Sequence, residues 1–151
     1  MNILLVENEK PAAEKIAWLL KKIDKTIAIA GITETVENTI NWIQENPQPD
    51  LILMDIQLDD GLCFEIFETI HLEIPVIFTT AYDDYTLKAF KVNSVDYLLK
   101  PIDESSLTLA INKFKNVHLS KPFSITDFGQ IAREHTVTYK SRFLVKVGNR
   151  Y

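Results

Sequence analysis

The chain has 151 residues, of which 46% are apolar and 25% charged, which suits one packed core and one domain of ordinary globular composition. No apolar run approaches the roughly 20 residues of a membrane helix, and the first segment lacks the basic region and cleavage site of a secretory signal. A single cysteine, Cys63, cannot form an internal disulfide, which agrees with a reducing compartment, so a cytoplasmic protein is expected.

The net charge of −5 is unevenly distributed along the chain. Residues 1–114 hold 9 Lys/Arg against 19 Asp/Glu, a net charge of −10, whereas residues 115–151 hold 7 against 2, a net charge of +5. A shift of this kind marks a boundary. A solvated tail is the ordinary explanation, but a basic segment after an acidic globule also suits a connector toward a nucleic-acid-binding part.

In chain order, short apolar runs typical of buried strands alternate with segments of helical periodicity. Pro11 falls in the first turn of the first helix, and Asp103 is placed to cap the last one. Trp18 and Trp42 are interpreted as aromatics that lie in the core or cover a face. The predicted strands are 2–6, 27–32, 51–54, 76–79 and 95–99, and the predicted helices are 10–23, 34–45, 62–71, 84–92 and 104–117.

This alternation predicts an α/β fold, a (βα)5 doubly wound parallel five-stranded sheet. In the flavodoxin-like order 2-1-3-4-5, ligands bind beyond the carboxyl ends of the strands, at the switch point between the first and third strands. The first strand ends before Glu7, and the third ends at Asp55. The set of residues predicted at the strand ends is Glu7, Asn8, Asp55, Thr79, Thr80, Ala81, Lys100 and Pro101.

This set of groups suits phosphoryl chemistry. Carboxylate oxygens bind a hard cation such as Mg²⁺. Asp55 can act as a nucleophile toward phosphorus and form an acyl phosphate, while the Thr80 hydroxyl and the Lys100 ammonium hold the added oxygens. A single Asp at a strand end is most often only a turn residue, so the hypothesis depends on the joint placement of these groups.

The sequence resembles the receiver domains of two-component response regulators over roughly residues 1–118. The segments LLVENE, LILMDIQLDDG, VIFTTAYDDY and FKVNSVDYLLKP carry this resemblance. It implies that Asp55 is the phosphoacceptor, that a histidine kinase supplies the phosphoryl group, and that Mg²⁺ is the cofactor. The metal ligands implied by the resemblance are Glu7, Asn8, Asp55 and the backbone carbonyl of Gln57.

The same resemblance assigns roles to residues near the ends of the fourth and fifth strands. It implies that Thr80, Ala81 and Lys100 stabilise the phosphoryl group. Thr80 and Tyr97 would be the switch pair, and a cis bond would precede Pro101. Phosphorylation would then shift Thr80 and Tyr97 and alter the face of the fourth helix, fifth strand and fifth helix, through which the protein would form a homodimer or release an output domain.

Asn8 departs from the family pattern, in which this position is commonly Asp. One formal charge is therefore missing from the metal site. An amide oxygen can still ligate a hard cation or orient its water, but with weaker electrostatic attraction. We expect weakened Mg²⁺ binding with the phosphoacceptor intact. The alternative is a pseudo-receiver, an interaction module that works independently of phosphorylation.

The segments DIQLDDG, FTTAYDDY and FKVNSVDYLLKPI resemble, more narrowly, those of receivers attached to LytTR DNA-binding domains of the LytR/AlgR-like family. Residues 119–141 mix Ser, Thr, Pro, Gly and charge without clear periodicity, which indicates a linker, and residues 142–151 are typical of a strand that enters a turn. The resemblance implies that residues 142–151 begin a truncated DNA-binding domain, so that DNA would be bound only through the missing output domain. Alternatively this segment is a tail that packs or pairs across a dimer.

Two other classes of protein fit the residues less well. A haloacid-dehalogenase-like phosphatase also uses an Asp nucleophile at a strand end, but resembling enzymes carry a second Asp two residues later, where this chain has Gln57. A flavodoxin-like cofactor binder needs a phosphate-binding loop after the first strand, where Glu7 and Glu9 repel phosphate. The resemblance therefore implies a transcription-regulating signal switch that is not an enzyme, and no contact with a membrane is expected.

Overall fold

The computed structural model describes residues 1–81 and 94–119. The helix expected at 84–92 lies outside the described residues, and so does the strand expected at 142–151. Of the linker expected at 119–141, only the first residue is described.

Contacts along the chain divide it into two compact units, Met1–His118 and Leu119–Tyr151. The main sheet and the helices that cover it belong to the first unit. In the part of the chain that the structure describes, every helix is too short or too polar to cross a membrane.

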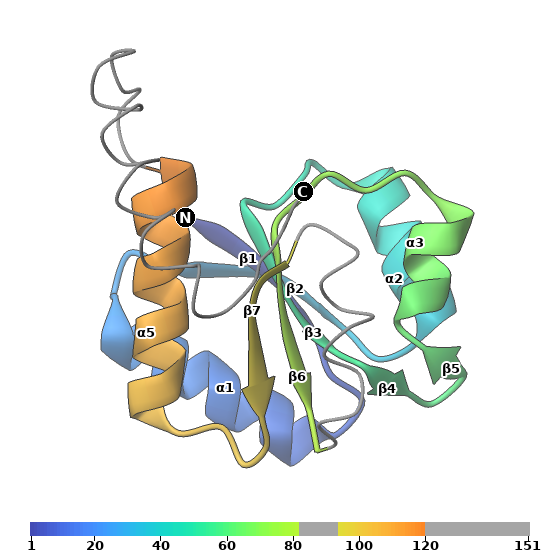
Figure 1. Ribbon diagram of the computed structural model, residues 1–151. Coiled ribbons are helices and arrows are strands. Elements are labelled where there is room, and N and C mark those ends of the chain that lie inside the picture. The colour runs from blue at the N-terminus through green and yellow to red at the C-terminus, as the bar shows by residue number, and fades with distance from the viewer. Residues whose placement is uncertain (82–93, 120–151) are drawn as a thin grey trace, which may run out of the picture. The chain divides into compact units, whose positions relative to one another are not determined.

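Five parallel strands form the main sheet, in the order β2-β1-β3-β6-β7 (Figure 1). Their apolar runs favour an extended backbone that is buried on both faces. The fourth and fifth strands of this sheet are labelled β6 and β7 because two short strands precede them in the chain. The order confirms the predicted doubly wound α/β fold. The strands are β1 (Asn2–Val6), β2 (Ala28–Thr33), β3 (Leu51–Asp55), β6 (Val76–Thr80) and β7 (Ser94–Leu99).

The described helices are α1 (Lys10–Ile23), α2 (Val36–Glu45), α3 (Phe64–Thr69) and α5 (Glu104–Phe114). Pro11 lies in the first turn of α1, as predicted, where its missing N–H leaves no helical hydrogen bond unmade. The Asp103 side chain accepts a hydrogen bond of 2.7 Å from the Ser106 N–H and caps α5, which confirms the predicted cap.

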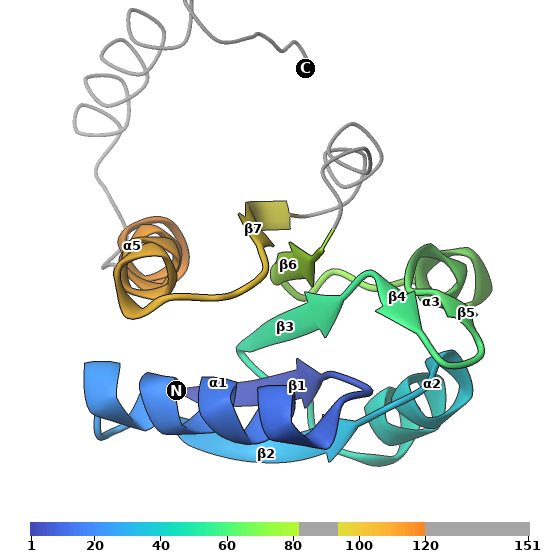
Figure 2. The same cartoon turned by 90° about the horizontal axis from the view of Figure 1, so that it is seen from below.

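The helices cover the two faces of the sheet in pairs. Figure 2 shows α1 and α5 on one side and α2 and α3 on the other. Because successive strand residues point to opposite faces, Leu53 and Ile77 pack with α1 and α5, whereas Met54 and Phe78 pack with α2 and α3. Each face of the sheet therefore packs against an apolar core of its own.

Several helix boundaries differ from the predicted ones, each for a local reason. The helix expected from residue 34 begins at Val36, because the Thr35 hydroxyl accepts a hydrogen bond from the Asn38 N–H and caps it. The helix expected at 62–71 is only Phe64–Thr69, because the preceding residues belong to a strand. The last helix changes at its C-terminal end into a π-helical segment, η1 (Lys115–Leu119).

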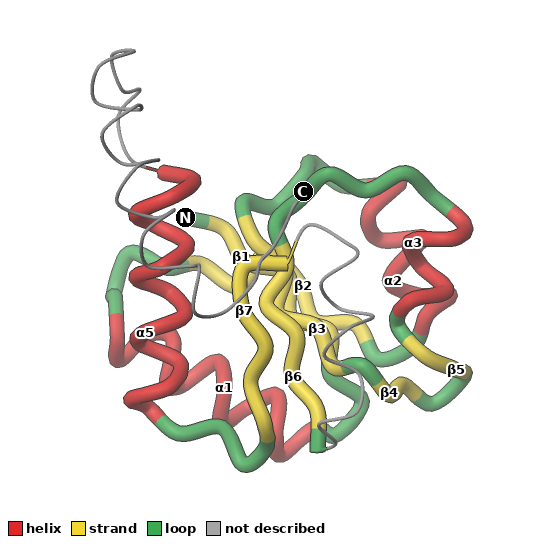
Figure 3. The backbone as a smooth tube through the Cα atoms, viewed as in Figure 1, coloured by secondary structure: helices red, strands yellow, loops and turns green. Residues whose placement is uncertain are grey.

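A two-stranded hairpin that the sequence analysis did not predict follows β3. Its antiparallel strands are β4 (Gln57–Leu58) and β5 (Gly61–Leu62), drawn in yellow beside α3 in Figure 3. Gly61 has φ of +149°, and a Cβ there would lie 2.2 Å from Glu65 Oε2. That same oxygen accepts a hydrogen bond of 3.1 Å from the Leu62 N–H. The turn therefore requires glycine at this position.

The two tryptophans lie in different surroundings. Trp42 packs against the α2 and α3 side of the core, and its indole lies so close to Gly31 that a Cβ there would be 2.5 Å from Nε1. Trp18 is 61% exposed, with Lys22 Nζ 5.2 Å from its ring centroid. The expectation of a core or face-covering aromatic was therefore wrong for Trp18, which lies on the outer side of α1.

Candidate functional site

The strands of the main sheet are parallel, so their carboxyl ends meet at one edge. β1 is followed there by Glu7 and Asn8, β3 ends at Asp55, β6 ends at Thr80, and β7 is followed by Lys100. Of these, Glu7, Asp55 and Thr80 are buried, each with 5% or less of its surface exposed. The sheet therefore brings together the polar side chains that the strand ends predicted.

Lys100 joins the two buried carboxylates. Its Nζ lies 2.9 Å from Glu7 Oε1 and 3.0 Å from Asp55 Oδ2. The Lys100 side chain is 19% exposed, so the ammonium sits between two acidic groups from which water is largely excluded. Coulombic attraction is stronger in such surroundings than at the surface, and it offsets part of the cost of burying three charges.

Backbone hydrogen bonds fix the position of each carboxylate. The Glu9 N–H donates to Glu7 Oε2 at 3.1 Å, and the Gln57 N–H donates to Asp55 Oδ1 at 3.3 Å. The Lys100 N–H donates to the Thr80 carbonyl at 2.7 Å, which ties the end of β7 to the end of β6. The residues that carry the charges are therefore held by main-chain contacts as well as by one another.

The surroundings change the acidity of two of these groups. Burial and the negative charge of Glu7 raise the pKa of Asp55, the hydrogen bond from Lys100 opposes both, and the net pKa is about 6. Burial lowers the pKa of Lys100, but Glu7 and Asp55 outweigh it, and the net shift is upward. At neutral pH Asp55 is therefore mostly ionised beside a firmly protonated Lys100.

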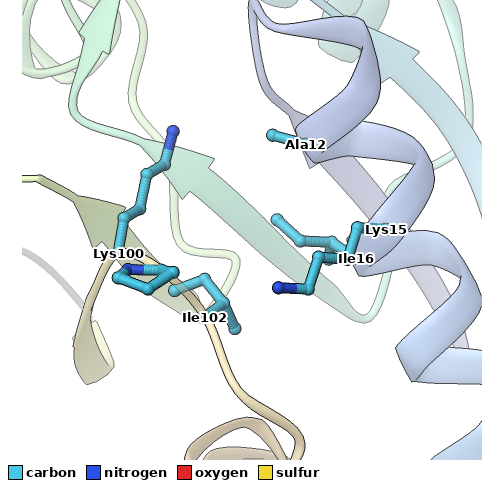
Figure 4. A pocket seen from close by; sticks show the side chains of 6 residues that line it. Ala12, Lys15, Ile16, Lys100 and Ile102 are labelled. Carbon is cyan, nitrogen blue, oxygen red and sulfur yellow. The ribbon is translucent and has the colours of Figure 1, made fainter.

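A polar pocket of about 330 Å³ opens onto this cluster. A second pocket, of about 350 Å³, lies on the other side of Lys100, against α1 and the segment that follows β7. Figure 4 shows that the Lys100 side chain extends away from Ile102 in this second pocket. The polar pocket is lined by Asn8, Glu9, Asp55, Gln57, Leu58, Thr80, Ala81 and Lys100.

The remaining residues of the expected set lie beside the cluster. Ala81 lines the polar pocket directly after β6. Tyr97 is half-buried in β7, where it packs against the α2 and α3 side of the core. The peptide bond between Lys100 and Pro101 is cis. The structure therefore brings Ala81 to the pocket and places Tyr97 on the neighbouring strand.

The donor groups at this edge fit a hard divalent cation. Glu7 Oε1 is buried, and its partner is the Lys100 ammonium 2.9 Å away. Asn8 and Gln57 line the pocket beside Asp55, so a side-chain amide and a neighbouring peptide group are near that carboxylate. Within residues 1–81 and 94–119, no group of three His, Cys, Asp or Glu side chains is placed to hold a metal. Any ion here would therefore depend on mixed carboxylate, amide and carbonyl ligands.

Two acidic residues that the sequence analysis did not single out border the same site. Asp59 and Asp60 form the turn between β4 and β5. Asp59 Oδ1 accepts a hydrogen bond of 2.9 Å from Asn8 Nδ2. Asp60 Oδ1 accepts one of 2.7 Å from the Val36 N–H, and Oδ2 accepts one of 3.1 Å from the Glu37 N–H. The Asp-Asp-Gly run was the available signal, because this composition is typical of a hairpin turn.

Comparison with protein families gives one match. The family model described as "Response regulator receiver domain" matches residues 3–112. This range contains all four strand ends that form the cluster.

Similar proteins come from several bacteria. The "Sensory transduction protein LytT" of Bacillus anthracis is 36% identical over 118 residues, which make up 76% of this chain and 47% of the relative. The "Positive alginate biosynthesis regulatory protein" of Pseudomonas aeruginosa is 34% identical over 117 residues, 75% of this chain and 46% of the relative. The chain thus spans about half the length of the curated relatives it matches.

Solved structures show the same architecture. The response regulatory domain of protein mrkE from Klebsiella pneumoniae has a TM-score of 0.70 and 25% identity, and the match covers 80% of this chain and all of that one. The N-terminal domain of a response regulator/sensory box/GGDEF 3-domain protein from Carboxydothermus hydrogenoformans has a TM-score of 0.65 and 29% identity, with 78% of this chain and 95% of that one covered.

Proposed function

The chain belongs to the family of response regulator receiver domains, and from this premise we propose that it is a phosphorylation switch in which Asp55 accepts the phosphoryl group from a histidine kinase. The observation that carries the proposal is the buried cluster of Glu7, Asp55 and Lys100, with Lys100 Nζ within 3.0 Å of both carboxylates. A nucleophile and a cation then line one polar pocket, and a second, buried carboxylate is ion-paired with the same cation.

Asp55 is suited to attack phosphorus. Its pKa of about 6 leaves it ionised at neutral pH, and its Oδ1 accepts only a long hydrogen bond of 3.3 Å from the Gln57 N–H. In the proposed step one carboxylate oxygen forms a bond to phosphorus while the bond from phosphorus to the donor imidazole nitrogen breaks. The imidazole leaves with the electron pair, and Asp55 becomes an acyl phosphate.

Lys100 and Thr80 are the residues that would hold the transferred group. The Lys100 ammonium already lies 3.0 Å from Asp55 Oδ2, so it can offset the charge that the phosphoryl oxygens bring. Thr80 is buried at the end of β6 and lines the same pocket, where its hydroxyl can donate to one of these oxygens. The backbone N–H of Ala81 is a further donor at this edge in the proposed assignment.

Mg²⁺ is the proposed cofactor, held by Glu7, Asn8, Asp55 and the carbonyl of Gln57. When bound, it would neutralise charge on the phosphoryl oxygens and orient them toward Asp55. Glu7 supplies a buried carboxylate that is ion-paired with Lys100, and Asn8 supplies an amide in place of a second acid. Weaker binding than at a site with a second carboxylate is therefore part of the proposal.

The proposed output is a shift between two conformations. Phosphorylation would draw Thr80 toward the new oxygens, and Tyr97, which is only half-buried, would move with it. The face expected to form a homodimer includes the fourth helix, which lies outside the described residues. We further propose that residues 119–141 are a linker and that residues 142–151 begin a LytTR-type domain, through which DNA would be bound. The protein would thereby act in transcription regulation as a phosphoprotein and not as an enzyme.

Intact-mass spectrometry tests the central step. After incubation with Mg²⁺ and acetyl phosphate, the wild-type protein is expected to gain the mass of one phosphoryl group, which hydroxylamine removes. Asp55→Ala is expected to gain nothing. Asp50→Ala is the matched control, because this exposed residue directly precedes β3 and lies at the opposite end of that strand from Asp55. No gain by the wild type at any Mg²⁺ concentration would instead support an interaction module that works without phosphorylation.

A further inference from the structure

The side-chain amide of Asn8 is held by a residue 51 positions later in the chain. Asn8 Nδ2 donates to Asp59 Oδ1 at 2.9 Å. Asn8 is half-buried and lines the polar pocket, whereas Asp59 is exposed in the turn between β4 and β5. The bond therefore joins the first strand end of the site to the hairpin that follows the third.

This bond decides which atom of the Asn8 amide faces the site. An ionised carboxylate can only accept a hydrogen bond, so the amide nitrogen must be the atom turned toward Asp59. The carbonyl oxygen of the same amide then points away from Asp59. Of the two ends of the Asn8 side chain, only this oxygen can ligate a hard cation or accept a hydrogen bond from its water.

The turn that carries Asp59 is itself anchored. Its neighbour Asp60 accepts hydrogen bonds of 2.7 Å and 3.1 Å from the Val36 and Glu37 N–H groups at the start of α2. Gly61 completes the turn with φ of +149°. Asp59 is therefore presented to Asn8 by a turn tied to the core through α2, and not by a loose loop.

The charges of the site give Asp59 a second role. Two buried carboxylates and one ammonium, those of Glu7, Asp55 and Lys100, leave one net negative charge for a divalent cation. Asp59 adds a second negative charge next to Asn8. An aspartate at position 8 would instead face Asp59 at hydrogen-bonding distance, where two carboxylates repel each other. Asn8 and Asp59 are thus complementary: the negative charge that residue 8 lacks at the strand end is carried by Asp59 in the turn.

We propose that Asp59 is the positioning residue of Asn8: it turns the amide oxygen toward the metal site and supplies, from outside the ligand set, the negative charge that Asn8 lacks. The inference rests on the Mg²⁺ site of the proposed function. Through this hydrogen-bonded neighbour, a site with an amide at this position would recover part of the attraction for Mg²⁺ that the missing carboxylate costs it.

Isothermal titration with MgCl₂ alone, on the full chain, tests this inference. Asp59→Ala removes both the acceptor and the charge and is expected to weaken Mg²⁺ binding about tenfold. Asp59→Asn keeps an acceptor oxygen but loses the charge, so a smaller loss of about threefold is expected. Glu68→Gln, which removes an exposed carboxylate from α3, is the matched control and should bind as the wild type does.

A charge exchange separates positioning from a merely structural effect. Asn8→Asp/Asp59→Asn returns the acid to the strand end and the amide to the turn, and it is expected to restore or exceed wild-type affinity. Equal affinity of wild type, Asp59→Asn and Asp59→Ala would overturn the inference while leaving the proposed function intact. Failure of the wild type to bind Mg²⁺ would overturn both, and urea midpoints of all variants would show whether each one is folded.

Discussion

Glu7, Asp55 and Lys100 form an inner half of the site that is nearly closed to water, whereas Asn8, Asp59 and Asp60 form an outer half that borders it. The inner half is held by ion pairs of 2.9 and 3.0 Å between buried groups. The outer half is held by hydrogen bonds of 2.7 to 3.1 Å at the surface. Charges interact strongly only where water is excluded. The inner half should therefore control the stability of the fold, and the outer half should control how the side chains of the site are oriented.

Removing the cation of the inner half should have the largest effect. Lys100→Met leaves the carboxylates of Glu7 and Asp55 buried without their shared ammonium, so a loss of about 3–5 kcal/mol in the free energy of unfolding is expected at pH 8. Urea denaturation in EDTA measures this loss. Lys113→Met, at an exposed position of α5, should change stability by no more than about 0.5 kcal/mol. Similar losses of unfolding free energy in the two variants would contradict the expectation that a buried lysine contributes more to stability than an exposed one.

Replacing Asp55 should have the next largest effect. This effect should depend on pH, and it should increase the free energy of unfolding instead of decreasing it. Burial raises the pKa of Asp55 from 3.8 to about 6, so the folded state binds its proton more tightly than the unfolded state. The stability that the neutral carboxyl contributes is present below the unfolded pKa and is lost as pH rises through about 6.

Asp55→Asn carries no ionisable group and should escape that loss. In EDTA at pH 8 it is expected to exceed wild type by about 1–3 kcal/mol in the free energy of unfolding, and the gain should disappear near about pH 4. Urea unfolding at both pH values measures the difference. A gain of the same size at both would mean that packing, and not ionisation, causes it.

The outer half should give the smallest effects on stability. Asp60→Ala deprives the Val36 and Glu37 N–H groups of their acceptors and should cost about 1 kcal/mol. Hydrogen exchange at these two amides should become faster. Asp59→Ala, one residue earlier, should cost no more than about 0.5 kcal/mol. A larger loss for Asp59 than for Asp60 would contradict the assignment of the anchor to Asp60.

Protonation should weaken the Asp60 contact as well. Some loss of hydration raises the pKa of the exposed Asp60, but the hydrogen bonds from the two α2 N–H groups lower it more, and the net shift is downward. The contribution of this contact is therefore present above the unfolded pKa and is lost as pH falls through the folded one. The difference between Asp60→Ala and wild type should accordingly shrink in acid, in contrast to the Asp55 variant.

The inner half could be predicted from sequence because it depends only on where the parallel strands of the sheet end. Once the strands before Glu7, Asp55 and Lys100 are identified as parallel, their ends must share one edge. Apolar periodicity is enough to find such strands, and the sheet order confirms them.

The outer half could not be predicted in the same way. The strands of the hairpin have only two residues each, too few to show periodicity. The bond between Asn8 and Asp59 spans 51 residues, and it depends on the turn and on a rotamer that the sequence does not specify. Trp18 shows a related limit, because a large apolar residue on a helix predicts burial only when its position faces the sheet.

Gly61 limits how the hairpin can be redesigned. Its positive φ and the Glu65 carboxylate 2.2 Å from its missing side chain exclude the other amino acids there without rebuilding the turn. Asp59, two positions earlier, is exposed and meets no such steric limit. A mutant library intended to change ion selectivity should therefore randomise position 59 and leave position 61 constant, since one turn holds both an exposed position and one whose backbone requires glycine.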